Sequence, residues 1–210
     1  MELINESQLE DIHQASLKLL CDTGMDFQSP QAVDILRRAG AMVDADGQRV
    51  RFDADWVMQT IATTPSEFVL HGRRPDRHIS MGGNSIAFAM VASTPNVSDL
   101  DRGRIAGNYD DFCNLLRLGE SLNSVQLQAG FPVEPCDVNV NTRHIVAGAA
   151  MARLTTKPVG GYALGRQRMQ DVIDIVRIGR GIDHATLLQQ PSIHTVVNSN
   201  SPLIYDGALL

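Results

Sequence analysis

The part of the sequence that most limits the fold is the run from residue 125 to residue 203. It holds three short apolar segments, at 125–135, 157–164 and 191–203, and each ends in proline, glycine, asparagine or another small polar residue. Helix-patterned stretches separate the three segments. Strands that alternate with helices form a parallel sheet with crossover helices. The pattern therefore predicts an α/β fold, with its functional residues where the strands end.

The helical stretches between these segments have the spacing of helices that lie on a sheet. Three strands and two crossover helices do not make a closed structure, and the third strand would be an exposed apolar edge. We therefore expect the fold to continue past residue 210. The residues predicted to face the sheet are Ala147, Ala150, Met151 and Leu154 in one helix, and Met169, Val172, Ile173 and Val176 in the next.

The chain before this run falls into two parts of different pattern. Residues 1–65 predict a small helical lobe with a hairpin, in which Ser29-Pro30 starts the second helix and Asp46-Gly47 turns the hairpin. Residues 66–107 contain short extended segments broken by glycine and proline, which predict two or three antiparallel β-hairpins. Residues 108–210 then form the parallel section.

The first helix of the lobe is predicted at residues 7–23, because Leu9, Ile12, Ser16 and Leu19 fall on one face. Further along, Asp53 is a predicted N-cap for a third helix. Asn108 is a predicted N-cap for the helix that opens the parallel section.

Composition excludes several classes of function. A net charge of −6, a pI near 5.4 and the absence of a Lys/Arg-rich run argue against nucleic-acid binding. No apolar stretch approaches the ~18 residues of a membrane span, and the acidic, polar N-terminus is not a signal peptide. Cys21, Cys113 and Cys136 are odd in number and lack C-x-x-C spacing, which indicates reduced thiols in a cytoplasmic protein.

Familiar catalytic and binding motifs are weak or missing. In GGYALGRQ, Arg166 and Gln167 stand where a phosphate loop has Lys and Ser/Thr, so tight backbone geometry explains its glycines better. The six histidines form no H-x-H or H-x-x-x-H pair, and no metal site is predicted. His144, in the first turn of a helix, is interpreted as a capping residue, with a place facing the strand ends as the alternative. His194 is interpreted as a core residue. No nucleophile has a base beside it in the sequence, so no catalytic residue is assigned.

The strand ends carry the candidate ligand-binding residues. Glu134 follows the first segment between two prolines, and a surface carboxylate is the alternative reading. Aromatic rings near strand ends could form a cage for a quaternary ammonium group, which ring faces attract; ordinary core or rim aromatics are the alternative. The predicted substrate-binding residues are Phe88, Phe131, Glu134, Tyr162, Asn198 and Asn200, with Tyr205 close by.

Five stretches together resemble one known family, the trimethylamine:corrinoid methyltransferases and their betaine-demethylating relatives. They occur in the family's order over essentially the whole sequence. The stretches are residues 12–44, 68–84 (FVLHGRRPDRHISMGGN), 95–104 (PNVSDLDRGR), 143–159 (RHIVAGAAMARLTTKPV) and 198–206 (NSNSPLIYD).

The resemblance implies a TIM (β/α)8 barrel, of which this chain would hold only about the first three βα units within 108–210. It implies a methyltransferase that moves a methyl group from trimethylamine or a betaine-type quaternary amine to the Co(I) of a partner corrinoid protein. The cobalamin would belong to that partner, with no cofactor bound by this chain itself. A homo-oligomer is expected. A pyrrolysine, found in the trimethylamine branch, would lie past residue 210.

The Co(I) of a corrinoid is itself a strong nucleophile. Such an enzyme therefore needs to position and desolvate its substrate, and it needs no Ser-His or Cys-His pair. Two alternatives remain open on the sequence. The truncated barrel could be a non-catalytic interaction module that pairs with another chain through its open sheet edge. A parallel α/β nucleotide binder would rest on GGYALGRQ alone.

Overall fold

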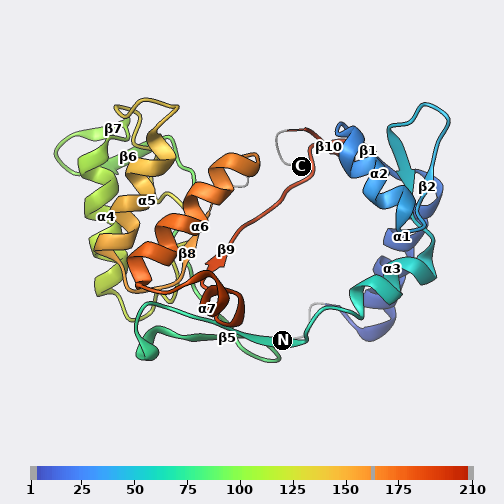
Figure 1. The fold of residues 1–210 in the computed structure, drawn as a ribbon, viewed down its shortest axis with the longest axis horizontal. Helices are drawn as coiled ribbons and strands as arrows, with labels where there is room; N and C mark the ends of the chain where they lie inside the picture. The colour runs from blue at the N-terminus through green and yellow to red at the C-terminus, as the bar shows by residue number, and fades with distance from the viewer. Residues whose placement is uncertain (1–3, 162–163, 208–210) are drawn as a thin grey trace. The chain divides into compact units, whose positions relative to one another are not determined.

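A computed structural model describes residues 4–161 and 164–207, and it has a mixed α/β fold. The chain divides into two compact units. Unit 1 comprises residues 1–65 and 197–210, and unit 2 comprises residues 66–196. The sheets of the described residues are small and none of them closes on itself (Figure 1). No helix in the described part of the chain is long and apolar enough to cross a membrane.

The helices of unit 1 are α1 (Glu6–Asp22), α2 (Pro30–Arg38) and α3 (Ala54–Ile61). The side chain of Ser29 accepts a hydrogen bond from the backbone of α2, and Asp53 does the same for α3. Both predicted N-caps are confirmed, because these short side chains satisfy backbone N–H groups that a helix leaves unpaired in its first turn.

The apolar face predicted for α1 does not face the core. Leu9, Ile12 and Leu19 have exposed fractions of 58%, 56% and 45%, whereas Leu17 is buried. The spacing located a helix correctly, but the core of unit 1 packs against a neighbouring face of that helix. An apolar stripe on α1 is therefore left at the surface of the described structure.

The sheet of unit 1 has the strand order β10-β1-β3-β2. Its strands are β1 (Met25–Phe27), β2 (Met42–Val43), β3 (Arg49–Arg51) and β10 (Ile204–Tyr205). The predicted hairpin is present as the antiparallel pair β2 and β3, and Gly47 in its turn has a φ of 74°. A positive φ strains residues with a side chain, which is why glycine suits this turn.

The strand β10 follows directly after the segment 191–203, in residues that were predicted to belong to the parallel section. It pairs in parallel with β1 instead, and Tyr205 stacks on Phe27 with ring centroids 5.1 Å apart. The division of the chain thus differs from the predicted one at residues 197–210. The physical reason is that the Tyr205 ring packs against the core cluster of unit 1, which contains the aromatic residues Phe27 and Phe52.

The substitution Tyr205→Ala is expected to loosen β10 from β1. The amides of Asp26 and Gln28 donate to the carbonyls of Leu203 and Tyr205, at 2.9 and 2.8 Å. Loss of the ring stack should raise the equilibrium constant for opening of these hydrogen bonds by about tenfold. Hydrogen exchange measured by NMR should show faster exchange at both amides. The amide of Gly160, in unit 2, serves as the internal control and should not change.

Unit 2 begins with two antiparallel hairpins, as predicted for residues 66–107. The first joins β4 (Glu67–Leu70) to β5 (Ile79–Gly82), with a 3-10 turn at Pro75–Arg77 between them. The second joins β6 (Asn96–Asp99) to β7 (Gly103–Ala106).

A parallel ladder of four extended segments forms the centre of unit 2. The strands β8 (Val159–Gly160) and β9 (Ile193–His194) pair in parallel. Parallel bridges join Gln128 to Val159 and Leu127 to Ala89. Three of these segments were predicted. The segment around Ala89 was assigned to the hairpins, because an extended pattern does not reveal whether its partner runs parallel or antiparallel.

Four helices complete the described part of unit 2: α4 (Tyr109–Ser121), α5 (Arg143–Leu154), α6 (Arg166–Arg180) and α7 (His184–Gln189). Asn108 caps α4 as predicted. The core of unit 2 contains most of the residues predicted to face the sheet. Its buried members include Phe112, Leu116, Phe131, Val133, Ala147, Ala150, Met151, Val159, Val172 and Val176.

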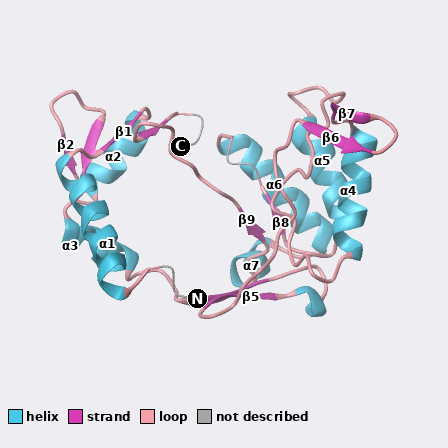
Figure 2. Ribbon diagram, turned by 180° about the vertical axis from the view of Figure 1, so that it is seen from behind, coloured by secondary structure: helices cyan, strands magenta, loops and turns pink. Residues whose placement is uncertain are grey.

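The helices α4, α5 and α6 all begin at one end of unit 2. The hairpin of β6 and β7 lies at this same end (Figures 1 and 2). The ladder segments run toward this end and the helices return from it, as expected where helices connect parallel strands. The carboxyl ends of the segments and the N-termini of the helices therefore meet there.

Candidate functional site

A cavity of about 110 Å³ lies at this end of unit 2, where the second and third ladder segments finish. We call it the strand-end pocket. One part of its lining is apolar and the other part is charged. The lining residues are Phe131, Glu134, Val140, Arg143, His144, Leu164 and Arg168.

The loop after the second segment places Phe131 and Glu134. The ring of Phe131 is 5% exposed and packs edge-on against Phe112, with centroids 5.4 Å apart. The backbone N–H of Glu134 donates to the carbonyl of Thr94 at 2.8 Å. Prolines on both sides of this loop restrict its backbone further. Both side chains are thus carried on a fixed piece of backbone.

The first residue of α5, Arg143, supplies a positive charge beside Glu134. The Nη1 atom of Arg143 lies 3.5 Å from Oε2 of Glu134, and each side chain is 23% exposed. The guanidinium also donates to the carbonyl of Val138, at 3.0 Å from Nη2. These contacts hold the carboxylate and the guanidinium in one geometry at partial burial, where their attraction is stronger than at a fully exposed surface.

The next residue, His144, ties α5 to α6. Its Nε2 atom lies 2.8 Å from Oδ2 of Asp171, and the side-chain amide of Gln167 donates to the other oxygen at 3.1 Å. The hydrogen bond from His144, followed by the one from Gln167, lowers the pKa of Asp171 below its ordinary value. The Nδ1 atom of His144 is buried and has no hydrogen-bond partner among the described residues.

The side chain of Arg168 comes from the first turn of α6 and is half-buried in the wall of the pocket. Within residues 4–161 and 164–207, no hydrogen bond or ion pair engages its guanidinium. Because α5 and α6 both begin at this pocket, their N-terminal dipoles add to the positive potential inside it.

This arrangement brings an aromatic ring, a carboxylate and two guanidinium groups into one cavity, with the guanidinium of Arg143 beside the carboxylate of Glu134. It can hold a ligand by charge and shape, and no described lining residue is a Ser, Thr or Cys nucleophile. Among the described residues, no three His, Cys, Asp or Glu side chains gather closely enough to hold a metal ion.

Two of the predicted substrate-binding residues, Phe131 and Glu134, line the strand-end pocket together. Phe88 is 62% exposed, and its carbonyl accepts from the amide of Gln126 at 2.8 Å. It therefore lies at the start of its ladder segment, whereas Phe131 lies past the end of the next one. Tyr162 falls outside the described residues.

The predicted residues Asn198 and Asn200 belong to unit 1 rather than to unit 2. The side-chain amide of Asn200 donates to Oδ2 of Asp206 at 2.6 Å, and its backbone bridges to Ile204. These contacts shape the turn that leads into β10. Asn198 is exposed.

The sequence reasoning missed Arg143 and Arg168. For His144 it gave a place at the strand ends as the alternative to capping, and His144 does line the pocket. All three lie in the first turn of a helix that follows a ladder segment. A search for charged residues in the first turn of each crossover helix could have found them. The N-termini of these helices and the carboxyl ends of parallel strands lie at the same edge of a sheet.

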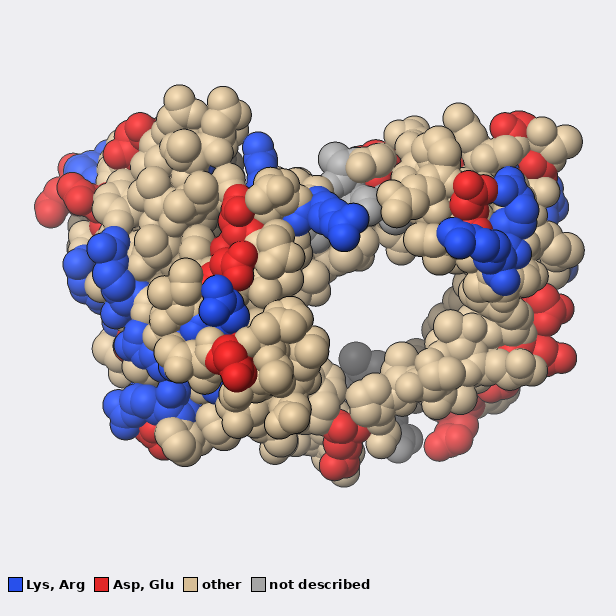
Figure 3. All heavy atoms as spheres, viewed as in Figure 1, with Lys and Arg blue, Asp and Glu red and all other residues tan. Residues whose placement is uncertain are grey.

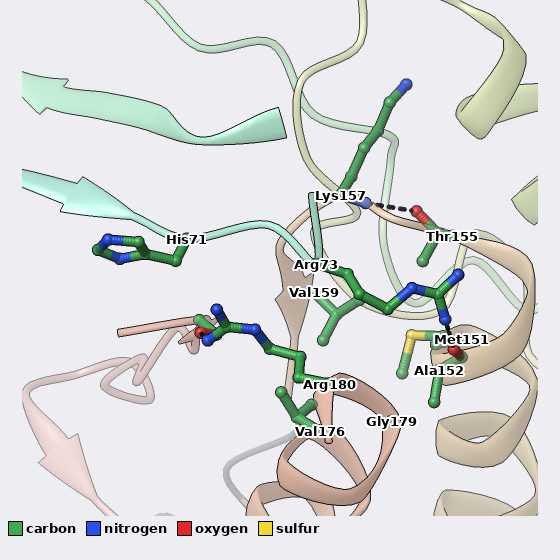
Figure 4. Close-up of a pocket in the computed structure, with 11 residues that line it drawn as sticks. His71, Arg73, Met151, Ala152, Thr155, Lys157, Val159, Val176, Gly179 and Arg180 are labelled. Atoms are coloured by element: carbon green, nitrogen blue, oxygen red, sulfur yellow. Dashed lines mark hydrogen bonds between the residues drawn. The ribbon is translucent and has the colours of Figure 1, made fainter. Parts of the chain in front are cut away.

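A second cavity, of about 30 Å³, lies at the opposite end of the ladder and is lined by His71, Arg73, Lys157 and Arg180 among others (Figure 4). Its cations already have partners. Arg73 donates to the carbonyl of Ala152, and Lys157 donates to the carbonyl of Leu122 at 2.8 Å. These carbonyls lie at the C-terminal ends of α5 and α4, where positive charge is favourable. The space suits a water molecule rather than a substrate.

Basic side chains gather at the lower left of unit 2 in the view of Figure 3, toward the end where α4 and α5 finish. Two exposed arginines lie near the end of α5: Arg153 is in its last turn, and Arg73 donates to the carbonyl of Ala152. Positive charge is favourable at a helix C-terminus, so a structural role accounts for both.

Comparison with known proteins gives consistent results. A family model described as trimethylamine methyltransferase (MTTB) matches residues 1–210. The chain is 28% identical over 208 residues to a glycine betaine methyltransferase of Desulfitobacterium hafniense strain Y51. It is 24% identical over 200 residues to the trimethylamine methyltransferase MttB of D. hafniense strain DSM 10664 / DCB-2. It is 20% identical over 215 residues to a proline betaine:corrinoid methyltransferase of Eubacterium limosum.

These matches cover 99%, 95% and 99% of the chain, respectively. They cover only 43%, 40% and 43% of the relatives. The chain therefore spans about two fifths of the length of the curated relatives it matches.

Proposed function

The chain belongs to the trimethylamine methyltransferase (MTTB) family, and from that premise we propose that it forms part of an enzyme that demethylates a methylated amine. The methyl group would pass to the cobalt of a corrinoid carried by a partner protein. The name of the E. limosum relative supports the corrinoid as acceptor. The free thiols of Cys21, Cys113 and Cys136 fit a reducing cytoplasm.

The strand-end pocket is the observation that carries this proposal. It places the ring of Phe131 and the carboxylate of Glu134 in one cavity. A quaternary ammonium group cannot donate a hydrogen bond, so ring faces and a nearby carboxylate are what attract it. The pocket also lies at the carboxyl ends of parallel segments, where enzymes of this architecture place their chemistry.

We further propose that unit 2 is the first part of a (β/α)8 barrel. Four parallel segments alternate with helices that return across them, and α4, α5 and α6 each follow one segment and precede the next. A complete barrel needs eight such units, and unit 2 accounts for about the first four strands.

Methyl transfer from a quaternary ammonium group needs no acid or base side chain to move a proton. In a quaternary ammonium donor, the bond between nitrogen and the methyl carbon breaks, its electron pair stays on nitrogen, and this nitrogen leaves uncharged. Trimethylamine gives the same outcome when its nitrogen is protonated. When bound, the corrinoid supplies the electron pair that forms the new bond to the methyl carbon. The residues of this chain would hold the ammonium, orient the scissile bond and limit the access of water.

The test is methyl transfer by the full chain under anoxic conditions, with cob(I)alamin as the acceptor. Trimethylamine, tetramethylammonium, glycine betaine and proline betaine are each offered as donors. Methylation of the corrinoid, followed by its absorbance, should match the demethylated amine seen by NMR. The proposal is contradicted if no donor loses a methyl group and none binds to the chain.

A second candidate function is a non-catalytic interaction module. The exposed apolar stripe of α1, formed by Leu9, Ile12 and Leu19, favours contact with another protein or a second copy. Sedimentation of the full chain distinguishes the readings. A defined oligomer that binds no methylated amine would support the module, and a monomer that binds one would contradict it.

A further inference from the structure

The charges of the strand-end pocket do not match a simple methylated cation. Its lining carries one carboxylate, Glu134, and two guanidinium groups. Glu134 has an ion-pair partner in Arg143 at 3.5 Å, but Arg168 has none within the described residues. An unopposed guanidinium repels a cation in a half-buried cavity, where charges are poorly screened. A ligand with only a positive charge would leave this repulsion in place.

The helix termini add to the mismatch. The pocket lies beside the N-termini of α5 and α6, and Arg143 and Arg168 both come from first turns. The helix dipoles therefore raise the potential near the arginines. The same lining holds the carboxylate of Glu134, which attracts a cation, and the ring of Phe131. The cavity thus combines an attraction for a cation with a guanidinium, that of Arg168, which has no partner among the described residues.

A group that is both cation and anion fits such a cavity. The names of the relatives do not decide the point, since two of them refer to betaines and one to trimethylamine. A betaine carries a carboxylate, whereas trimethylamine has none. The choice therefore has to come from the residues of the pocket.

We propose that the strand-end pocket takes a methyl donor that also carries a carboxylate, and that Arg168 is the residue that selects it. This inference rests on the proposed function. The ammonium end lies toward Phe131 and Glu134, and the carboxylate pairs with the guanidinium of Arg168. Arginine can bind a carboxylate through two parallel hydrogen bonds, which gives direction as well as strength.

The test is isothermal titration calorimetry of the full chain with two ligands. Glycine betaine carries the carboxylate, and tetramethylammonium is its counterpart without one. The wild-type chain should bind glycine betaine at least about tenfold more tightly, since hydrogen bonds between charged groups contribute that much or more. Arg168→Gln should remove this preference and leave the affinity for tetramethylammonium the same or slightly higher.

The control is Arg166→Gln, two residues away on the exposed side of the same helix. It should leave the preference intact, and thermal melts should show both variants folded. Equal binding of the two ligands by the wild-type chain would overturn the inference and leave the proposed function standing. So would a preference that survives Arg168→Gln. Failure of both ligands to bind would overturn the proposed function as well.

Discussion

The substitution Lys157→Met is expected to lower the free energy of unfolding of unit 2 by about 3 kcal/mol, because it removes a buried charge-assisted donor from two carbonyls. Lys157 is 3% exposed, and its Nζ atom donates to the carbonyls of Gly119 and Leu122. These groups lie at the C-terminal end of α4, where the helix leaves carbonyl oxygens unpaired.

The pKa of Lys157 shows how this site is balanced. Burial lowers it, while the charge of Glu120 opposes that effect. Glu120 in turn accepts hydrogen bonds from the hydroxyl groups of Thr155 and Thr156, at 2.8 and 2.6 Å. Methionine keeps the length and apolar contacts of the lysine stem, so the substitution isolates the loss of the ammonium group.

Thermal unfolding followed by circular dichroism measures the effect, and the midpoint should fall by about 6 to 12 °C. The matched control is Lys18→Met, at an exposed position of α1. It should shift the midpoint by less than about 2 °C, since surface substitutions change stability little. Equal shifts for the two variants would show that the carbonyls of α4 do not need this donor.

The second large effect is expected at Glu134. Glu134→Gln should weaken binding of tetramethylammonium by about tenfold, since the ligand loses the negative charge that attracts it. Glutamine keeps the size of the side chain, so the shape of the pocket should be preserved. Binding of glycine betaine should weaken less, because Arg143 loses its partner at 3.5 Å and becomes available to the carboxylate.

Calorimetric titration of both ligands measures this prediction, with Glu67→Gln as the control. Glu67 is an exposed carboxylate on β4 of the same unit and lies outside the lining of the pocket. Its substitution should change neither affinity. If Glu134→Gln leaves the affinity for tetramethylammonium unchanged, the carboxylate does not face the ammonium group.

Local signals in the sequence predicted much of the fold. Ser29, Asp53 and Asn108 each cap the helix that they were expected to cap. Gly47 turns the predicted hairpin. These features depend on a few neighbouring residues, which is why a single sequence reveals them.

The features that depend on distant partners were not predictable in the same way. The periodicity of α1 located Leu9 and Ile12 on one face, but the core of unit 1 lies against another. The ladder segment at Ala89 was hidden because its partner, Leu127, comes from a region read separately. Tertiary context decides such cases, and local pattern does not contain it.

The site shows the same limit. Phe131 and Glu134 could be placed in one pocket because both follow the same ladder segment. Arg143 and Arg168 come from two different helices, so nothing in their own stretches of sequence shows that they meet. Only the packing of α5 beside α6 brings them to one cavity.

The pairing of β10 with β1 has a consequence for biogenesis. Unit 1 is a discontinuous domain, because residues 66–196 are inserted between its two parts. During synthesis β1 emerges early, but its parallel neighbour β10 emerges only after all of unit 2 has been made. The N-terminal part must wait with one edge of its sheet unpaired, and unpaired edges invite wrong partners.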